Sequence, residues 1–147
     1  MQPIPENIIK FLRANHVISI AAAADGEIWS ACCFYVPDEA QARLIVLTSA
    51  RSKHGSLMLN NPNIAGTIAG QPENIAKISG IQLTATAQLL TDETDKKAAL
   101  ALYYKAHPIA RAMKSDVWSL RLENIKFTDN KLVFAQKTLW QREVQNA

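Results

Sequence analysis

The sequence predicts a mainly β protein: an antiparallel split barrel of Greek-key type, with six or seven strands and three or four short peripheral α-helices. Strand-like runs are mostly separated by short turn signals, so neighbouring strands should pair as hairpins. Alternating strand–helix–strand units and GxGxxG or Walker-type loops do not occur in the sequence, which argues against a parallel sheet. Closing such an antiparallel sheet into a barrel would remove its exposed edges.

The first half of the chain is expected to hold one helix and three strands. A proline at position 5 favours a helix start, and Asp25-Gly26 is a strong signal for a hairpin turn. The expected elements are a helix at Glu6–Ala14 and strands at His16–Ala24, Ile28–Val36 and Arg43–Thr48. Both faces of the middle strand are largely apolar, so we expect both faces to be covered.

The second half alternates between short helices and strands. Pro62 ends the first helix, Gly80 marks a bend within a long strand, and Thr91 is the expected N-cap of the longest helix. The expected elements are a helix at Ser52–Asn60, strands at Ile64–Ala69 and Ile75–Leu90, a helix from Thr91 to His107, and strands at Val117–Phe127 and Leu132–Leu139.

Length and composition limit the function classes. The 147 residues suit one domain spanning 1–147, and the net charge of +3 is too mild and too dispersed for a nucleic-acid footprint. Neither a long apolar run nor a secretory signal occurs in the sequence, so we expect a cytoplasmic protein without membrane contact. The neighbouring Cys32 and Cys33 are interpreted as two small buried residues in a reducing compartment.

One stretch has the composition of an anion site. Residues 48–55 read TSARSKHG and lie where a strand ends and a helix begins. Helix N-termini present unpaired N–H groups, and here Ser52, Lys53 and His54 add a hydroxyl, a full charge and an imidazole donor. The alternative is that Ser52 only caps the helix while the basic side chains are solvated. From the residues alone, that plainer interpretation is the more frequent one.

Several strings in the chain resemble a known family. TSARSKHGSLMLNNP (48–62), AGTIAGQP (65–72), ARAMKSDVW (110–118) and RLENIKFTDN (121–130) are similar to segments of the pyridoxamine phosphate oxidase-like, FMN-binding split-barrel proteins. Within that superfamily they resemble the uncharacterised YhbP-type group most. The resemblance implies a homodimer with two FMN sites at the subunit interface.

The resemblance also implies which residues bind the cofactor. Ser52, Lys53 and His54 fall where the family holds the FMN phosphate, and Thr48 and Ser49 fall where it contacts the ribityl chain or phosphate. Further cofactor contacts are implied for Ser30, Ala31 and Cys32, along the isoalloxazine ring, and for Trp140, which matches a late tryptophan of the family.

Departures from the family pattern bear on activity. His54 stands where the family has lysine, no Lys or Arg occurs between Arg13 and Arg43, and the basic Arg-x-His near the C-terminus is missing from the sequence. We therefore do not expect oxidation of vitamin B6.

Three functions stay open at this point. The leading hypothesis is an FMN-binding dimer with oxidoreductase activity toward a small molecule. The second is a non-enzymatic dimeric binding module for another anionic ligand, with cofactor binding weakened or lost. The third is a nucleic-acid-binding barrel, which the low aromatic content of 7% disfavours. The sequence does not identify a catalytic residue.

Overall fold

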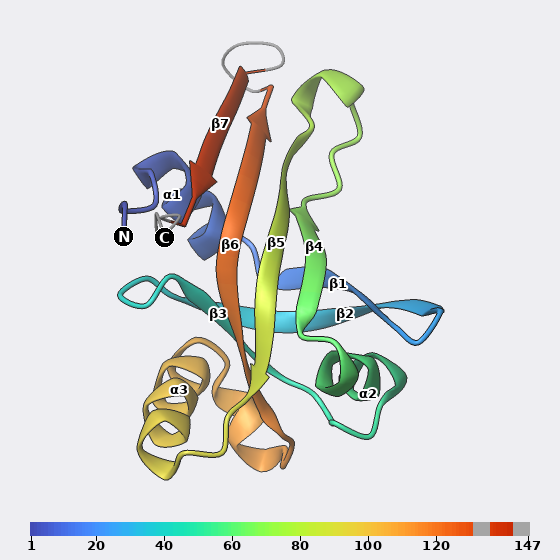
Figure 1. The fold of residues 1–147 in the computed structure, drawn as a ribbon. Coiled ribbons are helices and arrows are strands. Elements are labelled where there is room, and N and C mark those ends of the chain that lie inside the picture. Colours follow the sequence, from blue (N-terminus) through green and yellow to red (C-terminus); the bar gives the residue numbers. More distant parts are fainter. Residues whose placement is uncertain (131–135, 143–147) are drawn as a thin grey trace.

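The fold was obtained as a computed structural model that describes residues 1–130 and 136–142 (Figure 1). Its helices and strands follow each other in this order: α1 (Glu6–Ala14), β1 (Val17–Ala24), β2 (Glu27–Asp38), β3 (Arg43–Leu47), α2 (Lys53–Asn60), β4 (Asn63–Ala69), the 3-10 turn η1 (Ile75–Lys77), β5 (Ser79–Leu89), α3 (Glu93–Ala106), the 3-10 turn η2 (Pro108–Ala112), β6 (Val117–Asp129) and β7 (Gln136–Gln141).

The strands of the described residues form one antiparallel sheet in the order β3-β2-β1-β4-β5-β6-β7, and β3 also pairs with β6. That additional pairing closes six strands into a barrel and leaves β7 attached to the outer part of β6. Three consecutive strands followed by a fourth that returns beside the first make a Greek key. The predicted fold class is therefore confirmed.

Strand β6 changes partners halfway along one of its edges. Its first part, from Val117 to Arg121, pairs with β3, and its second part, from Asn124 to Asp129, pairs with β7. Between the two parts the barrel splits, and the side chain of Arg142 lies across the split. Its Nε donates to the Leu122 carbonyl at 2.8 Å and its Nη2 to the Ala42 carbonyl at 2.7 Å. Arg142 thus satisfies carbonyl groups on both sides of the split.

The barrel interior is filled by alternate residues of all the strands and by one face of α1. Trp118 and Tyr35 are the largest fully buried side chains, and the Tyr35 hydroxyl donates to the Leu12 carbonyl of α1 at 2.8 Å. Helix α1 contributes Ile8 and Leu12 to this core. The hydrogen bond between Tyr35 and α1 therefore fixes the N-terminal helix against the barrel.

Several predicted boundaries are confirmed and several are wrong. The helix at Glu6–Ala14 is confirmed, and Asp25 and Gly26 form the hairpin turn with φ of 52° and 80°. The strand expected from Ile75 begins at Ser79, because residues 75–77 form η1. The side chain that caps α3 is that of Asp92, not of Thr91, since it accepts from the Asp95 N–H at 3.0 Å. Of the last expected strand, residues 132–135 lie outside the described residues.

The outer face of β2 differs from expectation. Ile28 and Phe34, on this face, are 77% and 57% exposed, so the described chain does not itself cover it. Cys33 is buried, but Cys32 is exposed, which makes the prediction of two buried cysteines wrong. The physical reason is the alternation of a strand: neighbouring side chains point to opposite faces, and only one face is in the core.

An ion cluster attaches α3 to the barrel. The buried Arg43 side chain donates to Asp38 at 2.8 Å and forms two hydrogen bonds with Asp95, at 2.8 and 3.2 Å. These hydrogen bonds hold the pKa of the Asp95 carboxyl below its ordinary value, although partial burial acts in the opposite direction. Arg43 therefore joins β2, β3 and the first turn of α3.

Replacing Asp95 with Asn should lower the free energy of unfolding at neutral pH and make it depend less on pH in the acid range. A carboxylate whose folded-state pKa is depressed stabilises the fold above its unfolded value, about 3.9, and this contribution disappears as the pH falls through the lower folded-state pKa. Urea denaturation at pH 7 and pH 3 should show a difference between wild type and Asp95→Asn that narrows at pH 3. An equal difference in unfolding free energy between wild type and variant at both pH values would contradict the lowered pKa of Asp95. Glu73→Gln, which changes an exposed carboxylate, is the control.

Replacing Arg142 with Met should destabilise the protein by about 1–3 kcal/mol, because two carbonyl groups at the split lose a charged donor. Thermal and chemical denaturation of the variant would measure the change. The matched control is Arg121→Met, on the neighbouring β6, where the arginine side chain is 59% exposed. The control should stay within about 0.5 kcal/mol of wild type, and equal losses in both variants would contradict the role of Arg142.

Candidate functional site

The candidate site is the turn between β3 and α2. Ser52 is the N-cap of α2: its Oγ accepts from the Gly55 N–H at 3.0 Å and donates to the Ser49 carbonyl at 2.6 Å. The Ser49 hydroxyl accepts from the Arg51 N–H at 3.1 Å. A hydroxyl has one proton to donate, so Ser52 already uses its proton within the turn. The interpretation of Ser52 as a helix cap is confirmed.

The beginning of β6 holds this turn in place. The Asp116 carboxylate accepts from the Ala50 N–H at 2.8 Å, and the Asp116 carbonyl accepts from the Thr48 N–H at 3.0 Å. The indole N–H of Trp118 donates to the Thr48 carbonyl at 3.0 Å. Both residues come almost seventy positions later in the chain, so the barrel closure itself positions the turn.

Gly55 allows the helix to start so close to the turn. A Cβ atom at this position would lie 2.2 Å from the Ser49 carbonyl oxygen and 2.9 Å from the Ala50 Cα. Both contacts are with backbone, which cannot move aside as a flexible side chain could. Glycine is therefore required at this position for the observed path of the turn.

The imidazole of His54 faces the turn. Its Nε2 lies 2.7 Å from the Thr48 Oγ1 and 3.3 Å from the Ser52 Oγ. Burial lowers the pKa of His54 from its ordinary value, which favours the neutral ring at pH 7. His54 thus orders Thr48 and Ser52 and does not add a positive charge to the site.

Lys53 is directed toward the β1–β2 hairpin. Its Nζ lies 4.7 Å from the centroid of the Trp29 ring and 3.9 Å from the Glu27 carboxylate, and its side chain is 48% exposed. The backbone N–H groups of Lys53 and His54, at the start of α2, have no hydrogen-bond acceptor within the described part of the chain. Two free N–H donors and one half-exposed ammonium therefore lie at the helix N-terminus.

The other residues implied by the resemblance lie on β2 and β7. Ser30 and Cys32 point outward from β2, whereas Ala31 is partly buried and pairs with the buried Ile20. Trp140 is buried on β7 and donates to the Gln2 carbonyl at 3.0 Å. In Figure 1, β7 lies beside α1 and away from α2, so Trp140 is not brought to the turn within one chain.

The sheet next to the turn has an uncharged outer face. Strands β1, β2, β4 and β5 each contribute four outward positions, which are exposed or partly exposed and carry no Lys, Arg, Asp or Glu: Val17, Ser19, Ala21, Ala23, Ile28, Ser30, Cys32, Phe34, Asn63, Ala65, Thr67, Ala69, Gln82, Thr84, Thr86 and Gln88. We call these residues the uncharged face. A hollow of about 540 Å³ on this face is lined by residues of all four strands, among them Ala21, Ile28, Ala65 and Thr84, and at its edge by the carboxylate-bearing Glu123 of β6, which accepts from the Thr86 hydroxyl at 3.2 Å.

Sequence reasoning missed three residues of this site. Trp29 and Glu27 contact Lys53 across the hairpin, and Asp116 holds the turn from the other end of the chain. None of these three residues has a signal near the turn in sequence. Gly55, in contrast, has a local signal, since it stands three residues after a capping serine. Among residues 1–130 and 136–142, no group of three or more His, Cys, Asp or Glu side chains could hold a metal ion, and no helix is long and apolar enough to cross a membrane.

Comparison with solved structures shows the fold. A heme binding protein from Mycobacterium smegmatis superposes with a TM-score of 0.75 at 15% identity over 96% of this chain, which spans 59% of that protein's length. HutZ, the heme storage protein from Vibrio cholerae, gives 0.68 at 14% identity over 83% of this chain and 92% of its own. A FAD-binding protein from Mesorhizobium loti gives 0.67 at 15% identity over 84% of this chain and 94% of its own. These likenesses establish the split-barrel fold.

Sequence comparison shows the family. No family model matches the chain. A UPF0306 protein from Haemophilus ducreyi is 48% identical over 146 residues, which cover 99% of this chain and all of the relative. A UPF0306 protein from Serratia proteamaculans is 42% identical over 137 residues, 93% of this chain and 94% of the relative. With such identity over nearly its full length, and with the split-barrel fold described above, the chain belongs to the UPF0306 family.

Proposed function

We propose that this protein binds FMN as a homodimer, with the phosphate at the start of α2 and the isoalloxazine ring on the adjoining uncharged face. The observation that carries the proposal is the position of free helix N–H groups and an ammonium against the β1–β2 hairpin, whose outer face continues into a hollow lined mainly by small uncharged side chains. A flavin nucleotide needs both of these surfaces, one for its anionic end and one for its planar ring.

The phosphate end of the proposed site combines three donors. The N–H groups of Lys53 and His54 favour an anion at the positive end of α2, and the ammonium of Lys53 can add a charge-assisted hydrogen bond. Its contact with Glu27, at 3.9 Å and largely solvated, is weak, so Lys53 can turn toward a phosphate at little cost. Ser52 and His54 fit as residues that shape the turn rather than as phosphate ligands.

The ring end of the proposed site lies on the β1–β2 hairpin, which α2 contacts through Lys53 at its start and Asn61 just after its end. The Asn61 side chain, just after α2, donates to the Ala23 carbonyl at 2.9 Å and so ties the helix to the β1–β2 hairpin. The hollow on the uncharged face is lined by Ala23 and Ile28 of this hairpin. Its volume lies within the range of about 300–1,000 Å³ typical of cofactor pockets. Small neutral side chains leave room for a planar ring to approach the strands.

A second copy of the chain is the proposed cover of the uncharged face. Large exposed apolar areas are unusual in monomers and mark interaction surfaces, and Val17, Ile28 and Phe34 expose apolar side chains on this face. A twofold dimer presents the same face from each subunit, which suits a surface that is neutral throughout. A FAD-binding protein and a heme binding protein among the proteins of similar fold support a cofactor in this fold. Kinship with the YhbP-type group remains a prediction from the sequence.

Bound FMN would supply electron-transfer chemistry, while the residues of this chain would bind it, orient it and exclude water. Oxidoreductase activity is thus a proposal that follows from FMN binding. The alternative, a non-enzymatic module for another anionic ligand, uses the same α2 donors but does not need the uncharged face for a ring. The two are separated by the ligand that the protein retains.

FMN should bind more tightly than riboflavin, which has the same ring and no phosphate. Replacing Lys53 with Gln should weaken FMN binding by about 10- to 100-fold, because one charge-assisted hydrogen bond worth about 1.5–3 kcal/mol is lost, and should leave riboflavin binding unchanged. Fluorescence titration of apoprotein measures all of these affinities. Lys10→Gln, an exposed lysine on α1, is the matched control.

Three outcomes of this titration would count against FMN. Equal affinities for FMN and riboflavin would remove the phosphate site, and tighter binding of hemin than of FMN would assign the cavity to heme. Binding of inorganic phosphate with no binding of either flavin would favour the non-enzymatic module.

The wild-type protein should be dimeric, and Ala65→Glu should be monomeric. Ala65 is exposed at the centre of the uncharged face, so two glutamates would be buried close to the twofold axis without partners, while the monomer fold is undisturbed. Light scattering after gel filtration measures the mass, and circular dichroism checks the fold. Ala101→Glu, an exposed position on α3, should remain dimeric. A monomeric wild type at tens of micromolar would contradict the dimer.

A further inference from the structure

Two groups of exposed apolar side chains lie toward opposite ends of the molecule, and the second includes Phe34 at the end of the uncharged face. The first belongs to residues 70–78 between β4 and β5, which we call the arm. The second is formed by Phe34, Ile109 and Met113, which we call the apolar patch. Neither group lines the hollow of the uncharged face.

The arm contains the 3-10 turn η1 and is exposed along its whole length. All of its residues are exposed, and Ile75 and Ile78 have 87% and 46% of their surface accessible. Its turn is held by its own Asn74, whose side chain accepts from the Ala76 N–H at 2.9 Å and whose carbonyl accepts from the Lys77 N–H at 3.0 Å. The arm therefore presents two isoleucines to solvent on a defined 3-10 turn.

Phe34 of the apolar patch contacts the C-terminal end of α3. Phe34, Ile109 and Met113 are 57%, 81% and 60% exposed. The Phe34 ring packs edge-on against the His107 ring with centroids 5.5 Å apart, and the Tyr103 hydroxyl donates to the Phe34 carbonyl at 3.2 Å. The His107 Nε2 in turn lies 2.9 Å from the Tyr35 carbonyl. These contacts join the C-terminal end of α3, where η2 begins, to the end of the uncharged face.

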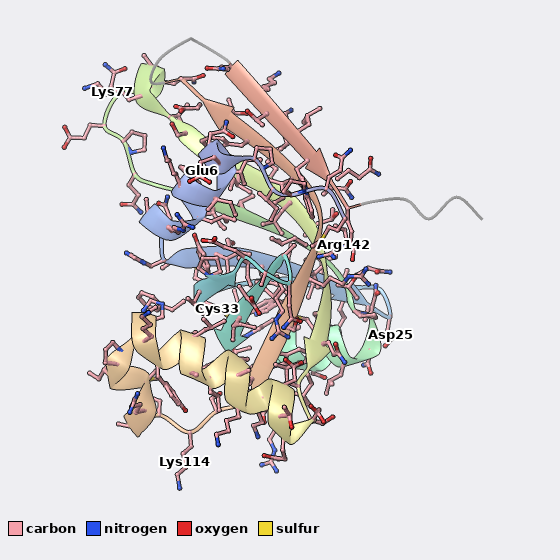
Figure 2. The ribbon with its side chains drawn as sticks, turned by 90° about the vertical axis from the view of Figure 1, so that its left-hand side faces the viewer. Glu6, Asp25, Cys33, Lys77, Lys114 and Arg142 are labelled. Carbon is pink, nitrogen blue, oxygen red and sulfur yellow. The ribbon has the colours of Figure 1, made fainter. Side chains whose placement is uncertain are left out.

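The two groups lie at opposite ends of the molecule. Figure 1 shows β5 running from the arm at the top to the connection with α3 at the bottom, where η2 also lies. Figure 2 shows Lys77 of the arm and Lys114, just after η2, at opposite ends. One chain cannot bring its own arm to its own patch. A twofold axis that lies in the plane of the uncharged face and runs perpendicular to β5 would stack the two faces and bring each arm to the patch of the other subunit.

We propose that the arm of each subunit docks Ile75 and Ile78 on the apolar patch of its partner. This inference rests on the dimer of the proposed function, and adds a contact that the dimer does not require. It accounts for the exposure of both groups with a single symmetric arrangement. It also places the partner's arm next to Phe34, two residues from Cys32 on the same face of β2.

Cross-linking between two differently tagged full-length chains tests the contact. One chain carries Ile75→Cys and the other Ile109→Cys, both with the exposed Cys32 replaced by Ser. A short bis-maleimide should join the two tags in the mixed dimer, because only residues in contact across the interface come within its reach. The control pair is Ile75→Cys with Leu139→Cys, since Leu139 is 73% exposed on β7 and lies outside the patch.

The dimer dissociation constant supplies a second measurement. Replacing Ile75 with Ser should raise it about a hundredfold, because each of two arms loses a buried isoleucine worth about tenfold. Leu139→Ser should leave it unchanged.

The outcomes separate this inference from the proposed function. A wild-type dimer with no cross-link, or with equal cross-linking in the control pair, would overturn the docking of the arm and leave the dimer and the FMN site intact. An unchanged dissociation constant in Ile75→Ser would overturn it as well. A monomeric wild type would instead remove the dimer, and the docking with it.

Discussion

Closure of the barrel by the pairing of β3 with β6 is the constraint on which the other features depend. One strand edge can pair with only one neighbour at a time, so β6 must leave β3 before it can pair with β7. Arg142 adds donors to the carbonyl groups of Leu122 and Ala42 at the resulting split, where the Leu122 N–H also donates to the Ala42 carbonyl at 3.1 Å. The same closure places Asp116 and Trp118, at the start of β6, against Thr48 and the turn that follows β3. The candidate site is thus built at the place where the barrel closes.

The candidate site depends on backbone geometry more than on side-chain charge. Gly55 lets α2 begin against the carbonyl of Ser49, and this leaves two N–H groups free at the helix start. His54 has a pKa lowered by burial and contributes order, not charge. The Lys53 ammonium lies at the helix start and contacts Trp29 and Glu27 of the hairpin. In the proposed function, such a site selects an anion by shape and dipole, with one movable cation.

Local signals predicted much of the fold, and long-range contacts account for what they missed. Pro5 and Asp25-Gly26 act on their own neighbours, and the elements they mark are confirmed. Ile75 was predicted as a strand residue because an apolar residue in a β-rich run resembles a core residue, yet it is exposed. The role of Ser52 as helix cap was also predictable, because a serine at a helix start acts on its own neighbours in the chain. The role of Asp116 depends on a residue distant in sequence from the turn, and no pattern within the turn could indicate it.

The uncharged face is proposed to bind both the flavin and the partner subunit, and this has a thermodynamic consequence. If flavin and partner subunit cover adjoining parts of the same face, each excludes water from the edge of the other, and the two binding equilibria are linked. A ligand that binds the dimer more tightly than the monomer must strengthen the dimer by the same factor. Apparent flavin affinity would then rise with protein concentration until dimerisation is complete. A face of small neutral side chains suits this arrangement, because it leaves no charge to be buried without a partner when either component is absent.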